Sequence, residues 1–184
     1  HPGETMLSRL IPVLSAFIGV ALFAIAFSLF LYHNRSKELE ASEEQIRYMA
    51  LHDPLTELPN RNYFNEYVDV ELAKGEGSAL LFLDLDRFKQ VNDTLGHPSG
   101  DALIREFGQR LKAIVRQGDV VARVGGDEFT VMLRGKASVR DVDVICQRIV
   151  DSARRPFVLG GQEVFVGVSV GVALAPRDGS DRVS

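Results

Sequence analysis

Residues Leu10–Tyr32 form a stretch of 23 residues that carries no charged side chain and is rich in Leu, Ile, Val, Phe and Ala. A helix needs about 20 such residues to cross the hydrocarbon core of a bilayer. A buried core helix of this length normally has a polar face, and this stretch has none. It is long for a secretory signal, and no small-residue cleavage site stands out. The sequence therefore predicts a transmembrane helix over residues 10–32, with residues 1–9 as the extracytoplasmic end of a truncated upstream region.

The charges that flank this span predict its orientation. Arg35 and Lys37 follow it closely, whereas Glu4 and Arg9 precede it. Because basic residues accumulate on the cytoplasmic side of membrane spans, the chain that follows is expected in the cytoplasm.

Residues 33–50 are charged and helix-prone, which predicts a juxtamembrane helix. Leu39 and Ile46 lie seven residues apart, with Ser42 and Met49 interleaved. At most two heptads are too few to define a coiled coil. The pattern fits a solvated helix, and it fits equally a signalling stalk that sets the spacing of two copies of the following domain.

Residues 51–184 contain several strand-like runs. The apolar run Ala79–Leu83 is typical of a buried strand. The runs 119–124 and 129–133 flank Gly125-Gly126, which predicts a hairpin with a tight primed turn because glycine accepts positive φ angles. Residues 163–174 predict a strand pair or one long bent strand, with Gly167 and Gly171 as candidate bulges.

Three helices are expected in the same region from capping residues and apolar periodicity. Their N-cap candidates are Asn60, Asp101 and Ser138, and the helices are expected over residues 60–74, 101–116 and 138–155. Ser138 with Asp141 three residues later resembles a capping box. Helices mixed with strands and an explicit hairpin predict an α+β fold, palm-like or ferredoxin-like, with an antiparallel-containing sheet and flanking helices.

Composition excludes some functional classes. A single cysteine, Cys146, excludes an intramolecular disulfide and a Cys-rich metal site. It falls in an apolar helical pattern, so we expect a buried structural thiol. The net charge of −4 gives no reason to expect nucleic-acid binding.

Two pairs of acidic residues mark a candidate metal site. Asp84 and Asp86 end the first strand at positions i and i+2, and therefore point the same way. Asp127 and Glu128 follow the Gly-Gly turn. Either pair alone is better explained as a helix cap or as solvated turn residues. Together they favour a Mg²⁺ site, because this ion is held by one or two carboxylates plus substrate phosphates.

The motifs resemble those of the GGDEF domain, the diguanylate cyclase family, over about Ala50 to the last residue. Four ordered segments carry the resemblance: Leu51-His-Asp-Pro-Leu-Thr-Glu-Leu-Pro-Asn-Arg61, Phe82-Leu-Asp-Leu-Asp-Arg-Phe-Lys-Gln-Val-Asn92 with its continuation to Asp101, Arg123-Val-Gly-Gly-Asp-Glu-Phe129, and Val168-Ser-Val-Gly-Val-Ala-Leu-Ala-Pro176. Glu57 replaces a glycine that is common in the first motif. The final helix of the family, which carries basic residues, is absent here, so residues 51–184 are expected to form a GGDEF domain without its C-terminal helix.

The resemblance implies a role for individual residues. Asp84, Asp127 and the Leu85 carbonyl would hold Mg²⁺ or Mn²⁺. Glu128 would assist, and the choice between Asp127 and Glu128 as general base stays open. Lys89 would meet the triphosphate. The expected substrate contacts are Phe88, Asn92, His97, Asp101, Arg123, Gly125 and Gly126, with Asn92 and Asp101 reading guanine.

A remote pair, Arg116 and Asp119, resembles the inhibitory product site of the family, with Arg148 as a further contact. The local alternative is an exposed ion pair worth under ~1 kcal/mol.

The implied function is that of a diguanylate cyclase at the cytoplasmic face of a bacterial inner membrane. It would act as a homodimer, join two GTP into cyclic di-GMP and release pyrophosphate. The alternative is a catalytically silent GTP- or cyclic di-GMP-binding module that controls a downstream EAL phosphodiesterase.

Overall fold

The computed structural model describes residues 2–135 and 138–179. The chain divides into two compact units, residues 1–47 and 48–184. Each unit is described by itself.

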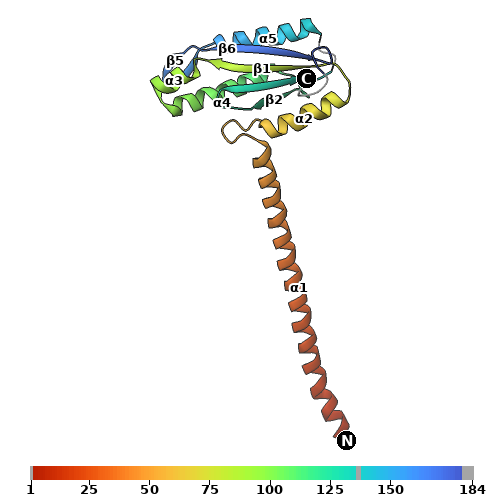
Figure 1. The fold of residues 1–184 in the computed structure, drawn as a ribbon. Coiled ribbons are helices and arrows are strands. Elements are labelled where there is room, and N and C mark those ends of the chain that lie inside the picture. Colours follow the sequence, from red (N-terminus) through yellow and green to blue (C-terminus); the bar gives the residue numbers. More distant parts are fainter. Residues whose placement is uncertain (1, 136–137, 180–184) are drawn as a thin grey trace. The chain divides into compact units, whose positions relative to one another are not determined.

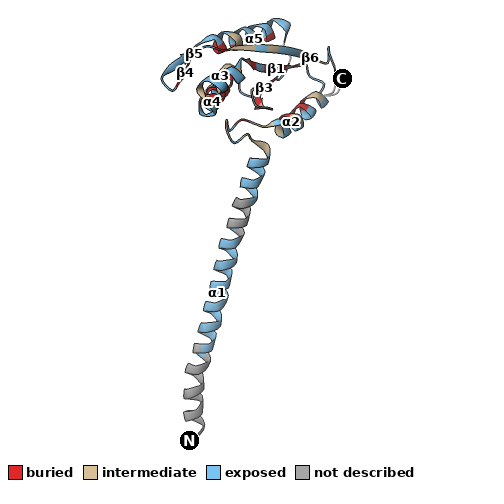
Figure 2. Ribbon diagram, turned by 60° about the vertical axis from the view of Figure 1, so that its left-hand side comes forward, coloured by how far each residue is buried: buried red, intermediate tan, exposed pale blue. Residues whose placement is uncertain are grey.

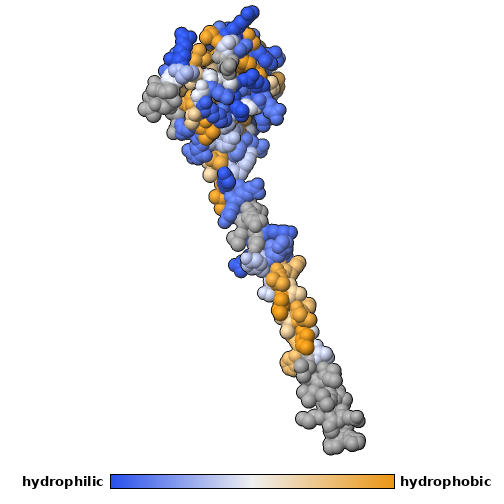
Figure 3. Space-filling view, turned by 90° about the vertical axis from the view of Figure 1, so that its right-hand side faces the viewer, coloured by the Kyte–Doolittle hydropathy of each residue, from blue (hydrophilic) through white to orange (hydrophobic). Residues whose placement is uncertain are grey.

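The described part of the first unit is helical and belongs to α1, Pro2–Leu51, one continuous helix whose last residues, from Tyr48, are counted in the second unit (Figure 1). Expected transmembrane and juxtamembrane helices are therefore parts of a single element. Within the described residues, Phe17–Arg35 is long and apolar enough to cross a membrane, and its side chains are exposed. Figure 3 shows these hydrophobic side chains as a continuous band on α1. Ile46 and Met49 are exposed, whereas the side chains of Leu39 and Ser42 lie outside the described residues.

The second unit is built on a four-stranded antiparallel sheet with the order β2-β3-β1-β6. Its strands are β1 (Ser78–Asp86), β2 (Val120–Arg123), β3 (Glu128–Leu133) and β6 (Gly167–Ala175). A separate hairpin joins β4 (Phe157–Leu159) to β5 (Gln162–Val164). The predicted α+β class with an antiparallel sheet and flanking helices is confirmed (Figure 1).

Helices cover both faces of this sheet. They are α2 (Arg61–Ala73), α3 (Phe88–Leu95), α4 (His97–Ile114) and α5 (Val139–Arg154). Alternate residues of β1, such as Leu81 and Leu83, form the main core with α4 and α5, where the rings of Phe107 and Phe129 meet edge to face. On the opposite face, Phe64 of α2 packs with Met132 of β3 in a smaller cluster. Buried residues accordingly concentrate in the sheet and the helix sides that face it (Figure 2).

Two predicted helix starts are confirmed by their capping bonds. The Asn60 side chain accepts hydrogen bonds from the backbone N–H groups of Asn62 and Tyr63, at 2.9 and 3.1 Å. Ser138 and Asp141 form the expected capping box at the start of α5.

The predicted N-cap at Asp101 is wrong. Helix α4 begins four residues earlier, at His97, because Pro98 lies in its first turn and favours a helix start there. Asp101 is therefore an exposed residue within α4. The helix also ends at Ile114 rather than at Arg116.

The strand interpretation of residues 163–174 needs correction as well. β5 pairs with β4 and not with β6. β6 runs in unbroken register along β1 from Gly167 to Ala175, so neither Gly167 nor Gly171 forms a bulge.

The primed turn predicted at Gly125-Gly126 is also wrong, because neither glycine has a positive φ angle. Residues 124–127 instead form a wider loop between Arg123 and Glu128. A two-residue turn with positive φ at both positions does occur, at Gly160 and Gly161, between β4 and β5. This is the geometry that glycine pairs favour in hairpins.

Candidate functional site

Carboxylates from β1 and the β2–β3 loop meet at one corner of the sheet. Asp84 and Glu128 are direct cross-strand partners, so their side chains share one face. The backbone N–H of Leu85 donates to the carbonyl of Asp127 at 3.3 Å, which ties the loop to β1. The structure therefore brings together the predicted metal residues Asp84, Leu85 and Asp127 with Glu128.

The electrostatics of this corner favour a cation. Desolvation raises the pKa of Asp84, and the negative charges of Asp127, Glu128 and Asp86 raise it further. Among the described residues, no three acidic, His or Cys side chains group closely enough to hold a metal ion by themselves. Mg²⁺ commonly takes only one or two carboxylates and completes its shell with substrate phosphates. The donor set therefore fits a metal ion that arrives with a phosphorylated ligand.

Asp86 plays a different part from its neighbour Asp84. The Ser169 hydroxyl on β6 donates to its carboxylate at 2.8 Å. Asp86 thus contributes to the pairing of β1 with β6.

Two guanidinium groups hold the loop that carries Asp127. Arg61, the first residue of α2, donates to the Val124 carbonyl at 2.7 and 3.1 Å. Arg123 donates to the Gly126 carbonyl at 2.9 and 3.2 Å. Its remaining nitrogen binds both carboxylate oxygens of Asp53, at 2.8 and 3.0 Å.

The Asp53–Arg123 pair is nearly buried, with side chains only 16% and 15% exposed. Desolvation raises the pKa of Asp53, but hydrogen bonds from Thr56 and Arg123 outweigh it, and the net pKa is lowered. The donors of Arg123 thus lie toward Asp53 and Gly126, in a loop-shaping position. Its expected contact with substrate stays a prediction.

The expected guanine pocket lies beside α3 and α4. The Oδ1 atom of Asn92 is buried and has no hydrogen-bond partner within the described chain. Gly100 leaves room for it, because a Cβ there would collide with the Asn92 side chain and lie 3.3 Å from the Phe88 ring. A buried acceptor without a partner is costly. The expected contact of Asn92 with guanine stays a prediction. Lys89, His97 and Asp101 are exposed nearby in sequence.

The residues of the remote pair also meet. Arg116, Asp119 and Arg148 line one cavity of about 330 Å³. The Asp119 side chain is 2% exposed and accepts from the backbone N–H groups of Arg116 and Arg134. Arg116 Nε also lies 3.4 Å from Asp119 Oδ1, so the two residues form the ion pair of the local alternative, with the Arg116 side chain 67% exposed. The role of this pair as a product site stays a prediction.

Cys146 is half-buried against the main core rather than fully buried. Desolvation, with the nearby charge of Asp143, raises the pKa of its thiol. A raised pKa disfavours the reactive thiolate.

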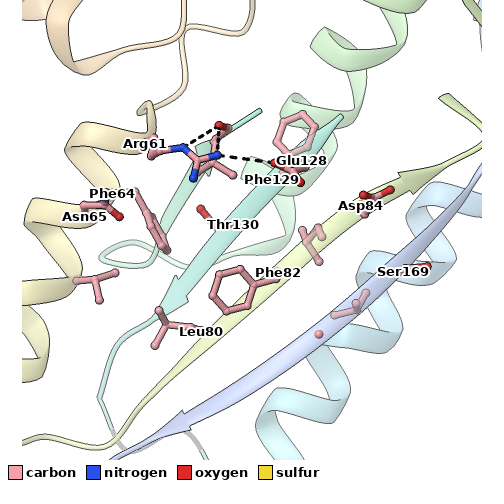
Figure 4. A pocket seen from close by; sticks show the side chains of 15 residues that line it. Arg61, Phe64, Asn65, Leu80, Phe82, Asp84, Glu128, Phe129, Thr130 and Ser169 are labelled. Carbon is pink, nitrogen blue, oxygen red and sulfur yellow. Dashed lines mark hydrogen bonds and ion pairs between the residues drawn. The ribbon is translucent and has the colours of Figure 1, made fainter. Parts of the chain in front are cut away.

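A cavity of about 570 Å³ borders the carboxylate corner, between α2 and the sheet. Figure 4 shows Arg61, Asp84 and Glu128 at its polar end and Phe82 and Leu80 along its apolar part. Thr130 contributes a buried hydroxyl oxygen that has no hydrogen-bond partner among the described residues.

Sequence reasoning gave no role to Asp53 or Arg61, although both stand in the quoted N-terminal motif. Their partners lie 70 and 63 residues away along the chain. Their place in the motif indicated that both residues matter. The neighbouring sequence did not reveal that they contact Arg123 and Val124.

Comparison with known protein families identifies the family of this chain. The family model "Diguanylate cyclase, GGDEF domain" matches residues 50–184. The chain belongs to this family.

Three curated relatives show the range of the family. The chain is 40% identical over 146 residues to the cyclic di-GMP phosphodiesterase NbdA of Pseudomonas aeruginosa, covering 77% of this chain and 18% of NbdA. It is 34% identical over 182 residues to the bifunctional diguanylate cyclase/cyclic di-GMP phosphodiesterase MucR of the same species, covering 92% of this chain and 26% of MucR. It is 38% identical over 144 residues to the diguanylate cyclase TpbB of P. aeruginosa, covering 76% of this chain and 33% of TpbB. The chain thus spans a third or less of these relatives.

A solved structure agrees with the fold. The coiled coil and GGDEF domain of DgcB from Caulobacter crescentus, in complex with c-di-GMP, superposes with a TM-score of 0.77 at 27% identity, covering 85% of this chain and 86% of DgcB.

Proposed function

We propose that this chain is the membrane-anchored catalytic region of a diguanylate cyclase, which joins two GTP into cyclic di-GMP and releases pyrophosphate. The observation that carries the proposal is the carboxylate corner, where desolvation and neighbouring negative charges raise the pKa of Asp84 beside an intact Gly125–Phe129 signature. Negative charges held together in this way fit a divalent cation with a triphosphate.

Asp84, Asp127 and the Leu85 carbonyl would hold Mg²⁺ or Mn²⁺, and Glu128 would complete the acidic cluster. A bound divalent ion supplies positive charge where negative charge develops during phosphoryl transfer. Asp127 or Glu128 would accept the proton of a ribose 3′-hydroxyl. Lys89, exposed on the first turn of α3, would meet phosphate oxygens.

Guanine selection would rest on Asn92 and Asp101, with Phe88, His97, Gly125 and Gly126 shaping the pocket. The unpartnered Oδ1 of Asn92 supports this assignment. Guanine offers two donors, N1–H and the N2 amino group, to an amide oxygen and a carboxylate. Adenine lacks that pair, so the site would prefer GTP to ATP.

Inhibition by the product would use the cavity of about 330 Å³ that Arg116, Asp119 and Arg148 line. Arg116 and Arg148 would bind phosphate or guanine edges of cyclic di-GMP through bidentate hydrogen bonds. Buried Asp119 would fix the loop that presents Arg116.

The reaction needs two nucleotides, and each domain would hold one, so the active form would be a homodimer. The apolar segment Phe17–Arg35 of α1 supports anchoring in the bacterial inner membrane, with the domain in the cytoplasm.

A regulatory module is the second candidate, because one relative, NbdA, is named as a cyclic di-GMP phosphodiesterase and another, MucR, as a bifunctional diguanylate cyclase/cyclic di-GMP phosphodiesterase. In this case the domain would bind GTP or cyclic di-GMP and tune a downstream EAL phosphodiesterase.

Pyrophosphate release by the full-length protein tests the first proposal. We expect release from GTP but not from ATP, with strict dependence on Mg²⁺ and loss in Asp127→Asn. GTP that stimulates phosphodiesterase activity without releasing pyrophosphate would favour the regulatory module.

A further inference from the structure

Arg61 holds the loop that carries Asp127 and also lies beside Glu128, a contact that none of the roles above uses. It is the first residue of α2, and its Nε and Nη2 atoms both donate to the Val124 carbonyl, at 3.1 and 2.7 Å. The same Nη2 atom lies 3.8 Å from Oε2 of Glu128. Figure 4 shows the Arg61 guanidinium beside Glu128 at the polar end of the large cavity.

Gly125 lies close to the same carboxylate oxygen of Glu128 that faces Arg61. A Cβ at position 125 would lie 2.5 Å from Glu128 Oε2 and 3.3 Å from its carboxyl carbon. The carboxylate therefore lies directly over the glycine, with the Arg61 guanidinium beside it. A side chain at position 125 would therefore displace the Glu128 carboxylate, and the φ angle of Gly125 is not an unusual one.

We propose that Arg61 is a positioning residue that holds Glu128 over Gly125 and competes with a divalent cation for its carboxylate. This inference deepens the proposed function, since it concerns the same acidic cluster. In the metal-free site, the guanidinium neutralises part of the charge that Asp84, Asp127 and Glu128 bring together. A cation that enters has to share Glu128 with Arg61.

The expected effect is modest because both side chains are largely exposed, at 62% and 53%. Exposed ion pairs contribute under about 1 kcal/mol, so loss of the Arg61 charge should tighten divalent-cation binding roughly two- to fivefold. A purely structural role predicts the reverse. Loss of the bonds to Val124 would loosen the loop and weaken cation binding.

The test measures Mn²⁺ binding to the full-length protein by electron paramagnetic resonance, in the presence of a GTP analogue that cannot react. The variants are Arg61→Met, Glu128→Gln and the double variant, and Arg61→Lys keeps the charge. Arg154→Met is the matched control, because Arg154 is an exposed arginine in the last turn of α5. Thermal unfolding of each variant checks that it is folded.

We expect Arg61→Met to bind Mn²⁺ more tightly, and Arg61→Lys and Arg154→Met to bind it as the parent does. In the Glu128→Gln background, Arg61→Met should have no further effect, because the coupling acts through Glu128. Weaker or unchanged Mn²⁺ binding by folded Arg61→Met, or the same gain with and without Glu128, would overturn the inference. The measurement needs no turnover, so a parent that makes no cyclic di-GMP overturns the proposed function while the role of Arg61 is still decided.

Discussion

At the scale of single residues, the N-terminal motif and the signature loop form one structural unit. Asp53 lies 70 residues before Arg123, yet their side chains form a nearly buried ion pair in which Nη1 of Arg123 donates to both carboxylate oxygens. Arg123 in turn holds the Gly126 carbonyl. The position of the loop that carries Asp127 therefore depends on a carboxylate from the start of the domain.

Asp53→Asn should destabilise the domain by about 2–3 kcal/mol at neutral pH, because it leaves a buried guanidinium without its charged partner. The folded-state pKa of Asp53 lies below its ordinary value of 3.8. A lowered pKa adds stability that is fully present above the unfolded-state value and is lost as pH falls through the folded-state value. Urea unfolding should therefore show a constant difference between parent and variant above about pH 5, which shrinks below pH 4. A difference that is the same at pH 3 and pH 7 would contradict this account.

Glu57 has a φ angle of +58°, in the left-handed region that glycine prefers. Glu57→Gly should raise the unfolding free energy by about 0.5–1 kcal/mol, because relief of strain of about 1–2 kcal/mol exceeds the entropic cost of glycine. Glu57→Ala is the matched control, since it keeps the Cβ and should bring no gain. A thermal melt compares the three proteins, and equal midpoints for Gly and Ala would refute the explanation by strain.

Arg116→Ala should weaken cyclic di-GMP binding roughly ten- to a hundredfold, because a charge-assisted bidentate contact is worth about 1.5–3 kcal/mol. Asp127→Ala should leave that binding intact, since Asp127 does not line the cavity of Arg116 and Arg148. Calorimetric titration of cyclic di-GMP separates the two effects. Unaltered binding by Arg116→Ala would show that this cavity is not a product site.

At the scale of helices and strands, the sequence predicted those features that depend on neighbouring residues. The helix starts at Asn60 and Ser138 follow from capping side chains within three residues. The β1 run and the two strands of the hairpin follow from apolar pattern, and cross-strand pairing then brings Asp84 beside Glu128.

Three other features could not be predicted from short sequence patterns: the start of α4, the long-range arginine contacts and the surroundings of Gly125. Asp101 is a good capping residue, but Pro98 starts α4 earlier. The contacts of Arg61 and Arg123 join positions more than 60 residues apart and leave no periodicity in the sequence. The Gly-Gly pattern predicts a tight turn at Gly125, whereas in the structure Gly125 has no positive φ angle and the Glu128 carboxylate lies against it.

The two glycine pairs should respond differently to substitution. Gly161 has a φ angle of +83°, so Gly161→Ala should cost about 1–2 kcal/mol of unfolding free energy. Gly126 has no positive φ, and a Cβ there meets nothing within 4 Å. Gly126→Ala should therefore stay within about 0.5 kcal/mol of the parent. Urea denaturation of both variants decides this, and equal losses would show that the turn geometry is not the cause.

At the scale of the whole molecule, α1 joins an apolar segment to the sequence that enters the domain. Leu22 lies inside Phe17–Arg35 and is exposed. Leu22→Arg should reduce membrane insertion, because an arginine at the centre of a spanning helix costs about 2.5–3.5 kcal/mol. Alkaline extraction of membranes from cells that express the full-length protein measures this, with Leu22→Val as control. If the parent itself is extracted into the soluble fraction, α1 does not span the membrane.

The central claim is that the carboxylate corner of this domain makes cyclic di-GMP. The most direct test incubates the full-length protein with GTP and Mg²⁺ and identifies the nucleotide products by mass spectrometry, with Asp84→Asn as the matched inactive variant. The account predicts cyclic di-GMP from the parent and none from Asp84→Asn. A folded, dimeric parent that binds GTP and Mg²⁺ but yields no cyclic di-GMP would contradict it.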